Sequence, residues 1–453
     1  MSRRAGSAFL SWALTAALLV TAPPGSGVLA QEPSPSPAPS AATSPGASVV
    51  PAPSPLSGPL AGIEILVRGE RDPDAVVPDE DLAAVVAGNT AFAFDLYREV
   101  ASEPGNLVLG PLSISFAMAM NQMGARGTSE SQTAAGMHFD LPSDRLAAGF
   151  DRLARELEDL VGPKVALSLV NQLFGQRDYP FQEPFLETLG SRFGAPMAVV
   201  DHGDAEAVRA LINAWVASRT NKRIKDLLPQ GSIDGLTRLV LVNATYLKAD
   251  WACPFNATFT EDRPFRLAPG MTVEVPTMSD GRFAGPIGRG DGYRAIELAY
   301  DGGRLAMLIV VPDDLAAFQA GLTRKAYQTI VTSLAEDRAA LTLPSFSAQT
   351  RVNLAGPLQA LGITDVFDAK LADLSGISPE PGLHVSAAVH QAFVKVAEKG
   401  TEAAAATAIG DSGTSGPPPA FRVDRPFLWF IRDRETGSIL FMGRVSDPRD
   451  SVK

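Results

Sequence analysis

Residues 394–420 read VKVAEKGTEAAAATAIGDSGTSGPPPA. An apolar, strand-like run ends at Glu398-Lys399-Gly400, and small residues, a Gly/Ser/Thr stretch and three prolines follow it. A loop of roughly twenty residues without secondary structure is unusual inside a compact domain. Gly400 permits a backbone hinge, and the alternate positions of 401–407 are small. We therefore expect a segment that can enter the middle of a β-sheet, because it offers an amide at every step and its side chains fit between packed neighbours.

The sequence around this stretch predicts a mixed α+β fold. Apolar residues at three- and four-residue spacing predict helices, and runs of β-branched and aromatic residues predict strands. Helices come first and strands dominate later, which favours large, mainly antiparallel sheets over regular βαβ units. The expected helices are 91–102, 113–124 and 205–219, and the expected strands are 167–174, 236–247, 305–311, 385–396 and 428–432.

The first thirty residues have the pattern of a secretory signal peptide. Arg3 and Arg4 precede an apolar run over 8–22, and small residues before Ala30 suit cleavage after that position. A retained membrane anchor would need about 20 unbroken apolar residues, and this run is interrupted at 23–25 by two prolines and a glycine. We therefore expect residues 1–30 to be removed and the protein to be secreted into the extracellular space.

Residues 31–60 form a linker that is rich in Pro, Ser and Ala. They include nine prolines and seven serines, and proline removes amide donors and fixes the backbone torsion, so we expect an extended, disordered spacer. Both a stalk and a featureless tail remain open as its role. From 61 to 450 the composition is that of one compact domain.

Composition excludes several classes of function. The 453 residues carry a formal net charge of −11, whereas nucleic-acid binding requires clustered Lys and Arg. A single cysteine, Cys253, rules out an internal disulfide, and four histidines leave little material for a metal site. Cys253 lies between Trp251 and Pro254, and we expect it to be a buried structural thiol. No cofactor-binding motif occurs, so we expect neither a cofactor nor a metal.

Three short motifs match known patterns but lack the right surroundings. Asn243 and Asn256 each begin an Asn-Ala-Thr glycosylation pattern. The first lies in a predicted strand, and we interpret both as incidental because the chain resembles a bacterial secreted protein. The tetrapeptide 410–413 (GDSG) surrounds the nucleophile in chymotrypsin-like proteases, and a serine protease is the enzyme alternative. A serine nucleophile needs a histidine base, however, and the nearest one, His390, precedes Ser412 by 22 residues within a predicted strand. We therefore expect no catalytic site.

The segment 398–408 (EKGTEAAAATA) resembles the hinge of an inhibitory serpin, a serine protease inhibitor. Residues 423–431 (VDRPFLWFI) resemble the signature that follows the serpin reactive loop. Further serpin-like motifs occur in serpin order along the chain: 106–114 (NLVLGPLSI), 169–174 (LVNQLF), 241–246 (LVNATY), 248–251 (KADW), 275–278 (VPTM), 361–367 (LGITDVF) and 441–445 (FMGRV).

This resemblance implies a fold and a mechanism. The expected fold has three β-sheets, namely a five-stranded sheet A and sheets B and C, with about eight or nine helices and an exposed reactive loop. The expected function is suicide inhibition of a serine protease. The protease cleaves the loop and forms an acyl-enzyme, and the freed loop then inserts into sheet A and distorts the tethered enzyme. A non-inhibitory serpin-fold binding protein, or a simple protease substrate, is the alternative.

The resemblance also assigns roles to individual residues. Gly110 stands where a second serine is usual beneath sheet A. Ser345 stands where a basic partner of Glu398 is common, so the opening region near Glu398 is expected to be held less tightly. The implied polar shutter beneath sheet A is Ser113, Asn171 and His390. Trp251 is implied to lie at the end of the sheet near Glu398. The implied hinge is Glu398, Lys399, Gly400, Thr401, Glu402, Ala403, Ala404, Ala405, Ala406 and Thr407.

Family spacing places the cleaved bond near residue 414. Counting forward from Gly400 gives Thr414-Ser415, counting back from Pro426 gives Ser415-Gly416, and 409–410 is a third choice. A small residue before the bond suits the pockets of elastase-like or subtilisin-like proteases. No Arg or Lys occurs in 400–421, which argues against trypsin-like targets.

Two further expectations concern insertion and partners. By alternation from Thr401, Asp411 would face inward in an inserted strand, which is costly unless that end stays hydrated. The predicted helix in 143–160 mixes acidic and basic residues without a basic face, so no heparin-type polyanion is expected. A monomer is the family default.

Overall fold

The computed structural model describes residues 58–61, 63–66, 69–72, 75–401 and 418–450. Within these ranges the chain forms nine α-helices and two hydrogen-bonded β-sheets, which confirms the predicted α+β class. The helix predicted over 205–219 has those bounds, whereas the one predicted over 91–102 is the second half of a helix that begins at Asp79. The helices are α1 (Asp79–Val100), α2 (Pro111–Gly124), α3 (Gly127–Met137), α4 (Ser143–Glu158), α5 (Glu183–Thr188), α6 (Ala205–Arg219), α7 (Leu315–Ala320), α8 (Arg324–Thr332) and α9 (Ala355–Ala360).

Sheet A has the strand order β1-β4-β3-β5-β13-β12-β11. The five longer strands match the five expected for this sheet, and two short strands add to them: β1 at the edge and β13 between β5 and β12. The strands are β1 (Glu64–Leu66), β3 (Val165–Gln176), β4 (Met197–Val200), β5 (Leu239–Asp250), β11 (Phe346–Asn353), β12 (Ala387–Ala397) and β13 (Gly400–Thr401).

The second sheet has nine strands and unites the expected sheets B and C. Its main path is β14-β10-β7-β8-β9-β15-β16-β2, and β6 pairs with β7. Sheets B and C are continuous with each other because β7 is 20 residues long and pairs with different neighbours along its length. The strands are β2 (Leu107–Leu109), β6 (Glu261–Ala268), β7 (Met271–Gly290), β8 (Tyr293–Ala299), β9 (Leu305–Pro312), β10 (Ala335–Pro344), β14 (Ala420–Arg422), β15 (Phe427–Asp433) and β16 (Ile439–Val445).

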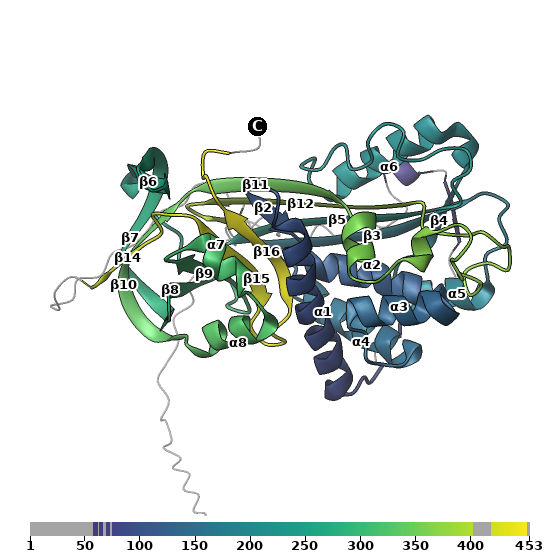
Figure 1. Cartoon of the computed structure of the whole chain (residues 1–453), viewed down its shortest axis with the longest axis horizontal. Helices are drawn as coiled ribbons and strands as arrows, with labels where there is room; N and C mark the ends of the chain where they lie inside the picture. The colour runs from purple at the N-terminus through teal and green to yellow at the C-terminus, as the bar shows by residue number, and fades with distance from the viewer. Residues whose placement is uncertain (1–57, 62, 67–68, 73–74, 402–417, 451–453) are drawn as a thin grey trace, which may run out of the picture. The chain divides into compact units, whose positions relative to one another are not determined.

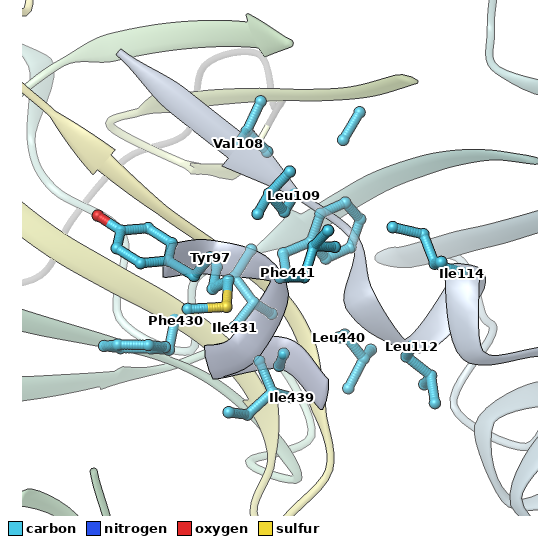
Figure 2. Packing of buried hydrophobic residues seen from close by; sticks show 14 of the residues in the cluster. Tyr97, Val108, Leu109, Leu112, Ile114, Phe430, Ile431, Ile439, Leu440 and Phe441 are labelled. Atoms are coloured by element: carbon cyan, nitrogen blue, oxygen red, sulfur yellow. The ribbon is translucent and has the colours of Figure 1, made fainter. Parts of the chain in front are cut away.

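The main core lies where α1, α2 and the second sheet meet. Figure 2 shows Tyr97 of α1 beside side chains of β2, β15 and β16, including Phe430 and Phe441. The strands β15 and β16 are buried along their whole length, and each contains a continuous apolar run, 427–431 (FLWFI) and 439–442 (ILFM), rather than an alternating one. Phe346 of β11 contacts Phe427 at a ring-centroid distance of 5.5 Å, which joins sheet A to this core.

Helices cover both faces of sheet A. In Figure 1, α1 to α4 lie on one side of the long strands, and α6 lies on the other side. The α2 helix contacts β3 and β5, and α6 contacts β3. Sheet A is therefore buried on both faces at its centre, where polar side chains must find partners within the protein. Among the described residues, none of the helices combines the length and the apolar character needed to cross a membrane.

Candidate functional site

The hinge begins inside sheet A. β12 ends at Ala397, the chain turns at Glu398 and Lys399, and β13 returns between β12 and β5. Thr401 lies opposite Val396 of β12 and Ala249 of β5, and both pairings are antiparallel. Further along, β5 and β12 pair directly with each other in parallel. The first two residues of the segment after the turn thus already occupy a strand position between two neighbours.

Gly400 is required by the close approach of β5. Its φ is +150°, and a Cβ atom built on it would lie 2.0 Å from the carbonyl oxygen of Ala249 and 2.7 Å from the Cα of Asp250. Real Cβ atoms do not approach backbone so closely. Any other residue would therefore push β13 away from β5.

Thr401 is anchored by an aromatic pair. It is fully buried, and its Oγ1 lies 2.7 Å from the hydroxyl of Tyr300. The Tyr300 ring stacks on Trp251 with centroids 4.5 Å apart, and Trp251 Nε1 donates to the carbonyl of Ala397 at 3.0 Å. Burial raises the pKa of Tyr300, so this hydroxyl stays protonated and available for hydrogen bonding. Trp251 therefore contacts both β12 and the residue that supports β13.

The turn at 398–399 is held by the segment that follows β5. The amide of Trp251 donates to the carbonyl of Lys399 at 2.6 Å, and the amide of Phe255 donates to that of Glu398 at 2.7 Å. The Glu398 carboxylate accepts a hydrogen bond from Thr260 Oγ1 at 2.8 Å. Ser345 instead bonds to the carbonyl of Pro276. The Glu398 carboxylate is thus bonded to the neutral hydroxyl of Thr260, while Ser345, which the resemblance places at the position of a basic partner, bonds elsewhere.

A polar cluster crosses the centre of sheet A. Asn171 of β3, Asn243 of β5 and His390 of β12 stand in one row of paired residues. Asn243 Nδ2 donates to Asn171 Oδ1 at 2.6 Å and to Ser113 Oγ of α2 at 2.7 Å, and Ser113 Oγ donates to Asn171 Oδ1 at 3.3 Å. On its other side, Asn243 Oδ1 lies 2.5 Å from His390 Nδ1. The predicted residues Asn171 and His390 therefore meet through Asn243.

Sequence reasoning does not assign Asn243 to this cluster. The residue stands out in the sequence as the start of a glycosylation pattern, but its side chain is 1% exposed and fully engaged, so it is inaccessible in the folded chain. Two signals of its role are present in the sequence. Asn243 is a polar residue in an otherwise apolar strand, and Leu-Val-Asn occurs both at 169–171 and at 241–243, which places two asparagines on paired strands.

His390 is held neutral. Its Nε2 accepts the Gly110 amide hydrogen at 3.0 Å, so Nδ1 carries the proton and donates it to Asn243 Oδ1. Complete burial lowers the pKa of His390 to about 3. At Gly110, a Cβ would lie 2.6 Å from Thr245 Oγ1 and 3.3 Å from His390 Cε1. The absence of a side chain at this position is what allows the histidine to reach the backbone.

Several predicted features lie outside the described residues. They are the hinge positions Glu402, Ala403, Ala404, Ala405, Ala406 and Thr407, the GDSG motif, and the bond Thr414-Ser415 with both of its alternatives. The described residues contain no group of three or more His, Cys, Asp or Glu side chains arranged to hold a metal ion.

The expectation for Cys253 is wrong. Its thiol is exposed and free rather than buried. Cys253 lies in an irregular segment after β5, in which Trp251 and Phe255 fill the core and the residues between them face solvent. An apolar neighbourhood in sequence does not predict burial here, because only two of the five residues from 251 to 255 point inward.

Comparisons with known sequences cover most of the chain. The serpin (serine protease inhibitor) family model matches residues 87–448. The leukocyte elastase inhibitor of Bos taurus is 38% identical over 377 residues, which cover 80% of this chain and 99% of that protein. A serpin-like protein of Thermococcus kodakarensis is 35% identical over 433 residues, which cover 94% of this chain and 96% of that protein.

Solved structures agree with these sequence matches. A highly specific serpin of the insect Tenebrio molitor aligns with a TM-score of 0.73 at 28% identity, over 82% of this chain and 100% of that chain. The native thermophilic serpin tengpin shares the fold, with a TM-score of 0.75 at 21% identity over 84% of this chain and 97% of that one. The chain therefore belongs to the serpin (serine protease inhibitor) family and is not an enzyme.

Proposed function

We propose that this serpin inhibits elastase-like or subtilisin-like serine proteases by suicide trapping. The target protease cleaves the segment after β13 and becomes covalently attached as an acyl-enzyme. The freed segment then extends β13 between β5 and β12. About 14 residues separate Gly400 from Thr414, and at roughly 3.3 Å per residue the tethered protease travels about 45 Å. The chemistry belongs to the protease, and the inhibitor supplies the displacement.

The position of β13 is the observation that carries this proposal. Thr401 already pairs with Val396 and Ala249, and both pairings can continue along the strands. Extended residue by residue, they bring position 410 opposite Ala387 and Val240, which at present pair with each other. The two registers agree over the whole length, so a single strand can enter without shifting β5 against β12.

Insertion is favourable because it replaces parallel pairing with antiparallel pairing. Over 240–246 and 387–393, β5 and β12 are parallel, and parallel pairs are slightly less stable per residue than antiparallel ones. An inserted strand is antiparallel to both neighbours, as β13 is now. Each inserted residue also adds backbone hydrogen bonds, which contribute about 1 kcal/mol each.

The extended register gives inward-facing residues specific neighbours. Position 407 would stand opposite His390 and Asn243, and its alternation from Thr401 directs the Thr407 hydroxyl toward the polar cluster. Asp411 would fall one residue beyond Ala387, opposite the exposed Ser386. On the other side Asp411 would stand opposite Leu239 of β5, which is buried in the core, so the cost anticipated from the sequence remains on that side.

The test is covalent complex formation. We would incubate the protein with pancreatic elastase, subtilisin and trypsin, separate the products on denaturing gels and sequence the released C-terminal peptide. We expect an SDS-stable complex with the first two enzymes and a peptide that begins at Ser415. Cleavage in 402–417 without such a complex, and with full protease activity remaining, would show a substrate or binding protein instead.

Export to the extracellular space is part of the same proposal. Its support is the charged, apolar and small-residue pattern of residues 1–30. The mature protein should begin at Gln31 when it is recovered from the medium or periplasm of an expressing cell. N-terminal sequencing checks this, and an intact Met1 on protein retained in the cytoplasm would contradict it.

A further inference from the structure

Two exposed lysines lie where the hinge strand β13 enters sheet A. Both neighbours of β13 are described throughout their length, and the rest of each strand is buried or partly buried. In β5 the single exposed residue among twelve is Lys248, and in β12 the single exposed residue among eleven is Lys395. Each of the two strands that would separate during insertion therefore presents one exposed side chain, and both side chains are cationic.

The pairing of β13 places the two lysines at the same level. Thr401 stands opposite Ala249 of β5 and Val396 of β12. The next position, 402, would therefore stand opposite Lys248 on one side and Lys395 on the other. Residues that stand directly opposite each other in a sheet share a face. Both lysines thus lie on the face toward which the side chain of residue 402 would point.

The residue at position 402 is a glutamate. Glu402 lies outside the described residues, and it is the one charged residue in the sequence 400–410 (GTEAAAATAIG). Neighbouring strands lie about 4.8 Å apart, and each lysine carries its ammonium group on a flexible four-carbon stem. A carboxylate between β5 and β12 at this level is therefore within reach of both ammonium groups.

The described surroundings leave these two charges available. Among the described residues, no carboxylate lies within ion-pair distance of Lys248 or Lys395. Asp250, two residues beyond Lys248 on the same face, stands opposite Gly400. The Glu398 carboxylate accepts its hydrogen bond from Thr260 instead. Asp250 is thus the described carboxylate that could compete with Glu402 for Lys248.

The face that carries the lysines is covered at the other end of the sheet and open at this one. Val240, Val242 and Ala244 alternate on this face of β5 and belong to one apolar cluster with Trp215 of α6. Lys248 continues the same alternation, but it is exposed. A glutamate can therefore enter at position 402 without the desolvation that a buried carboxylate would require.

We propose that Lys248 and Lys395 bind the carboxylate of Glu402 and hold the start of the inserting segment in register. This rests on the proposed function, because it assumes that cleavage frees the segment to extend β13. Opposite charges on directly paired residues stabilise a sheet. A slip of one residue would turn Glu402 toward the buried face, so the two lysines also determine which hinge residues point inward. They are positioning residues, and they favour insertion over hydrolytic release of the protease.

The test reverses the charges on both sides of the contact. The variants are Lys248→Glu/Lys395→Glu, Glu402→Lys, and the triple variant that combines them and restores opposite charges. The matched control is Lys325→Glu/Lys370→Glu, which changes the net charge as much as the double variant does, at two exposed positions far along the chain from β5 and β12. We would measure the ratio of cleaved to covalently trapped inhibitor with subtilisin on denaturing gels, at about 0.05 M and about 0.5 M NaCl.

We expect this ratio to rise about tenfold over the control for Lys248→Glu/Lys395→Glu and for Glu402→Lys at low salt, with a smaller rise at high salt. The triple variant should return to within about twofold of the wild type. Lysines that served only solubility or folding would not be rescued by Glu402→Lys. Equal ratios for Lys248→Glu/Lys395→Glu and the control, or a triple variant no better than the double one, would overturn the proposal.

A second measurement separates this contact from protease trapping. We would compare thermal unfolding midpoints before and after subtilisin cleaves each variant. If the wild type is cleaved without being trapped but gains stability, trapping is wrong, and a gain that is a few degrees smaller in Lys248→Glu/Lys395→Glu and restored in the triple variant still supports the lysine contact. If the wild type neither traps subtilisin nor gains stability, no segment enters the sheet and both proposals are wrong.

Discussion

At the scale of single residues, two buried polar contacts control the region between β5 and β12. The Thr401 hydroxyl meets Tyr300 where the hinge enters the sheet, and His390 meets Asn243 at the centre. Both contacts lie in a low-dielectric interior, where an unpaired polar atom costs about 1–3 kcal/mol. Each can therefore be tested by removing one partner at a time.

Replacing Thr401 by Val should leave the Tyr300 hydroxyl buried without its partner. We expect the thermal unfolding midpoint at a fixed scan rate to fall by a few degrees. The substitution Tyr300→Phe should lower the midpoint as well, and the double variant should lose less than the sum of the single losses. Strict additivity would show that the two hydroxyls do not interact.

The second residue-scale prediction concerns pH. The pKa of His390 is about 3 in the folded protein, against 6.5 for an unperturbed histidine, so the unfolded chain binds more protons between these values. The stabilisation by neutral His390 is thus complete above pH 6.5 and is lost as the pH falls toward 3. We expect His390 to lower the free energy of unfolding by about 1.4 kcal/mol for each pH unit below pH 6.

The matched substitutions are His390→Gln and His384→Gln. Glutamine at 390 can accept from Gly110 and donate to Asn243, but it does not titrate. Desolvation lowers the pKa of the buried His202 to about 4, so this residue also lowers the stability of the folded protein as the pH falls. Denaturant midpoints measured from pH 7.5 to 4.5 should therefore show a shallower decline for His390→Gln, whereas His384→Gln, in an exposed loop, should follow the wild type. An unchanged slope for His390→Gln would contradict the assignment.

At the scale of elements, the important feature is the junction between β5 and β12, two long strands that are parallel neighbours. Within the described chain, no other such pair in sheet A lies next to the hinge strand β13. Ala392 and Thr245 face each other across this junction, and both are buried. Thr245 Oγ1 has no hydrogen-bond partner. Both side chains are close to cysteine in size, so this pair is suited to a disulfide lock.

We predict that Ala392→Cys/Thr245→Cys, in a Cys253→Ser background, blocks inhibition when oxidised. Neighbouring strands lie about 4.8 Å apart, within the range of Cα separations that disulfides span. The bridge would hold the junction closed at the level where position 405 must enter, so the protease would cleave the loop and escape. Reduction should restore the SDS-stable complex in the same sample, and trapping by the oxidised form would rule out insertion at this junction.

At the scale of the whole molecule, Gly400 and Thr401 are the described residues that occupy a strand position between β5 and β12 of sheet A. Extending β13 to position 410 would add about nine residues, each with new antiparallel hydrogen bonds worth about 1 kcal/mol. The gain is comparable to the entire stability of an ordinary domain, about 5–15 kcal/mol. Under the proposed mechanism, the native fold would persist because insertion is blocked kinetically while the chain is intact.

Cleavage should therefore stabilise the protein. We expect the unfolding midpoint, followed by circular dichroism, to rise by about 10 °C or more after a protease cuts near residue 414. The control is Thr401→Arg, which would place a charge where the side chain is fully buried and should prevent insertion, so that cleavage leaves its midpoint unchanged. An equal midpoint before and after cleavage of the wild type would show that no insertion occurs.

The family, the fold class and the positions of the main elements could be predicted from the sequence alone. The run 398–408, the ordered motifs and the apolar periodicity are local signals, and periodicity reports directly which face of an element is buried. For this reason α6 has its predicted bounds, and the strands predicted over 305–311 and 428–432 appear as β9 and β15 with small differences at their ends.

Only the tertiary structure decided how distant residues meet. Asn243 joins Asn171 to His390 because three strands from separate parts of the chain align in register. The exposure of Cys253 depends on how its neighbours turn into the core. Register and packing are set by the sum of many weak contacts across the fold, so no single stretch of sequence contains them.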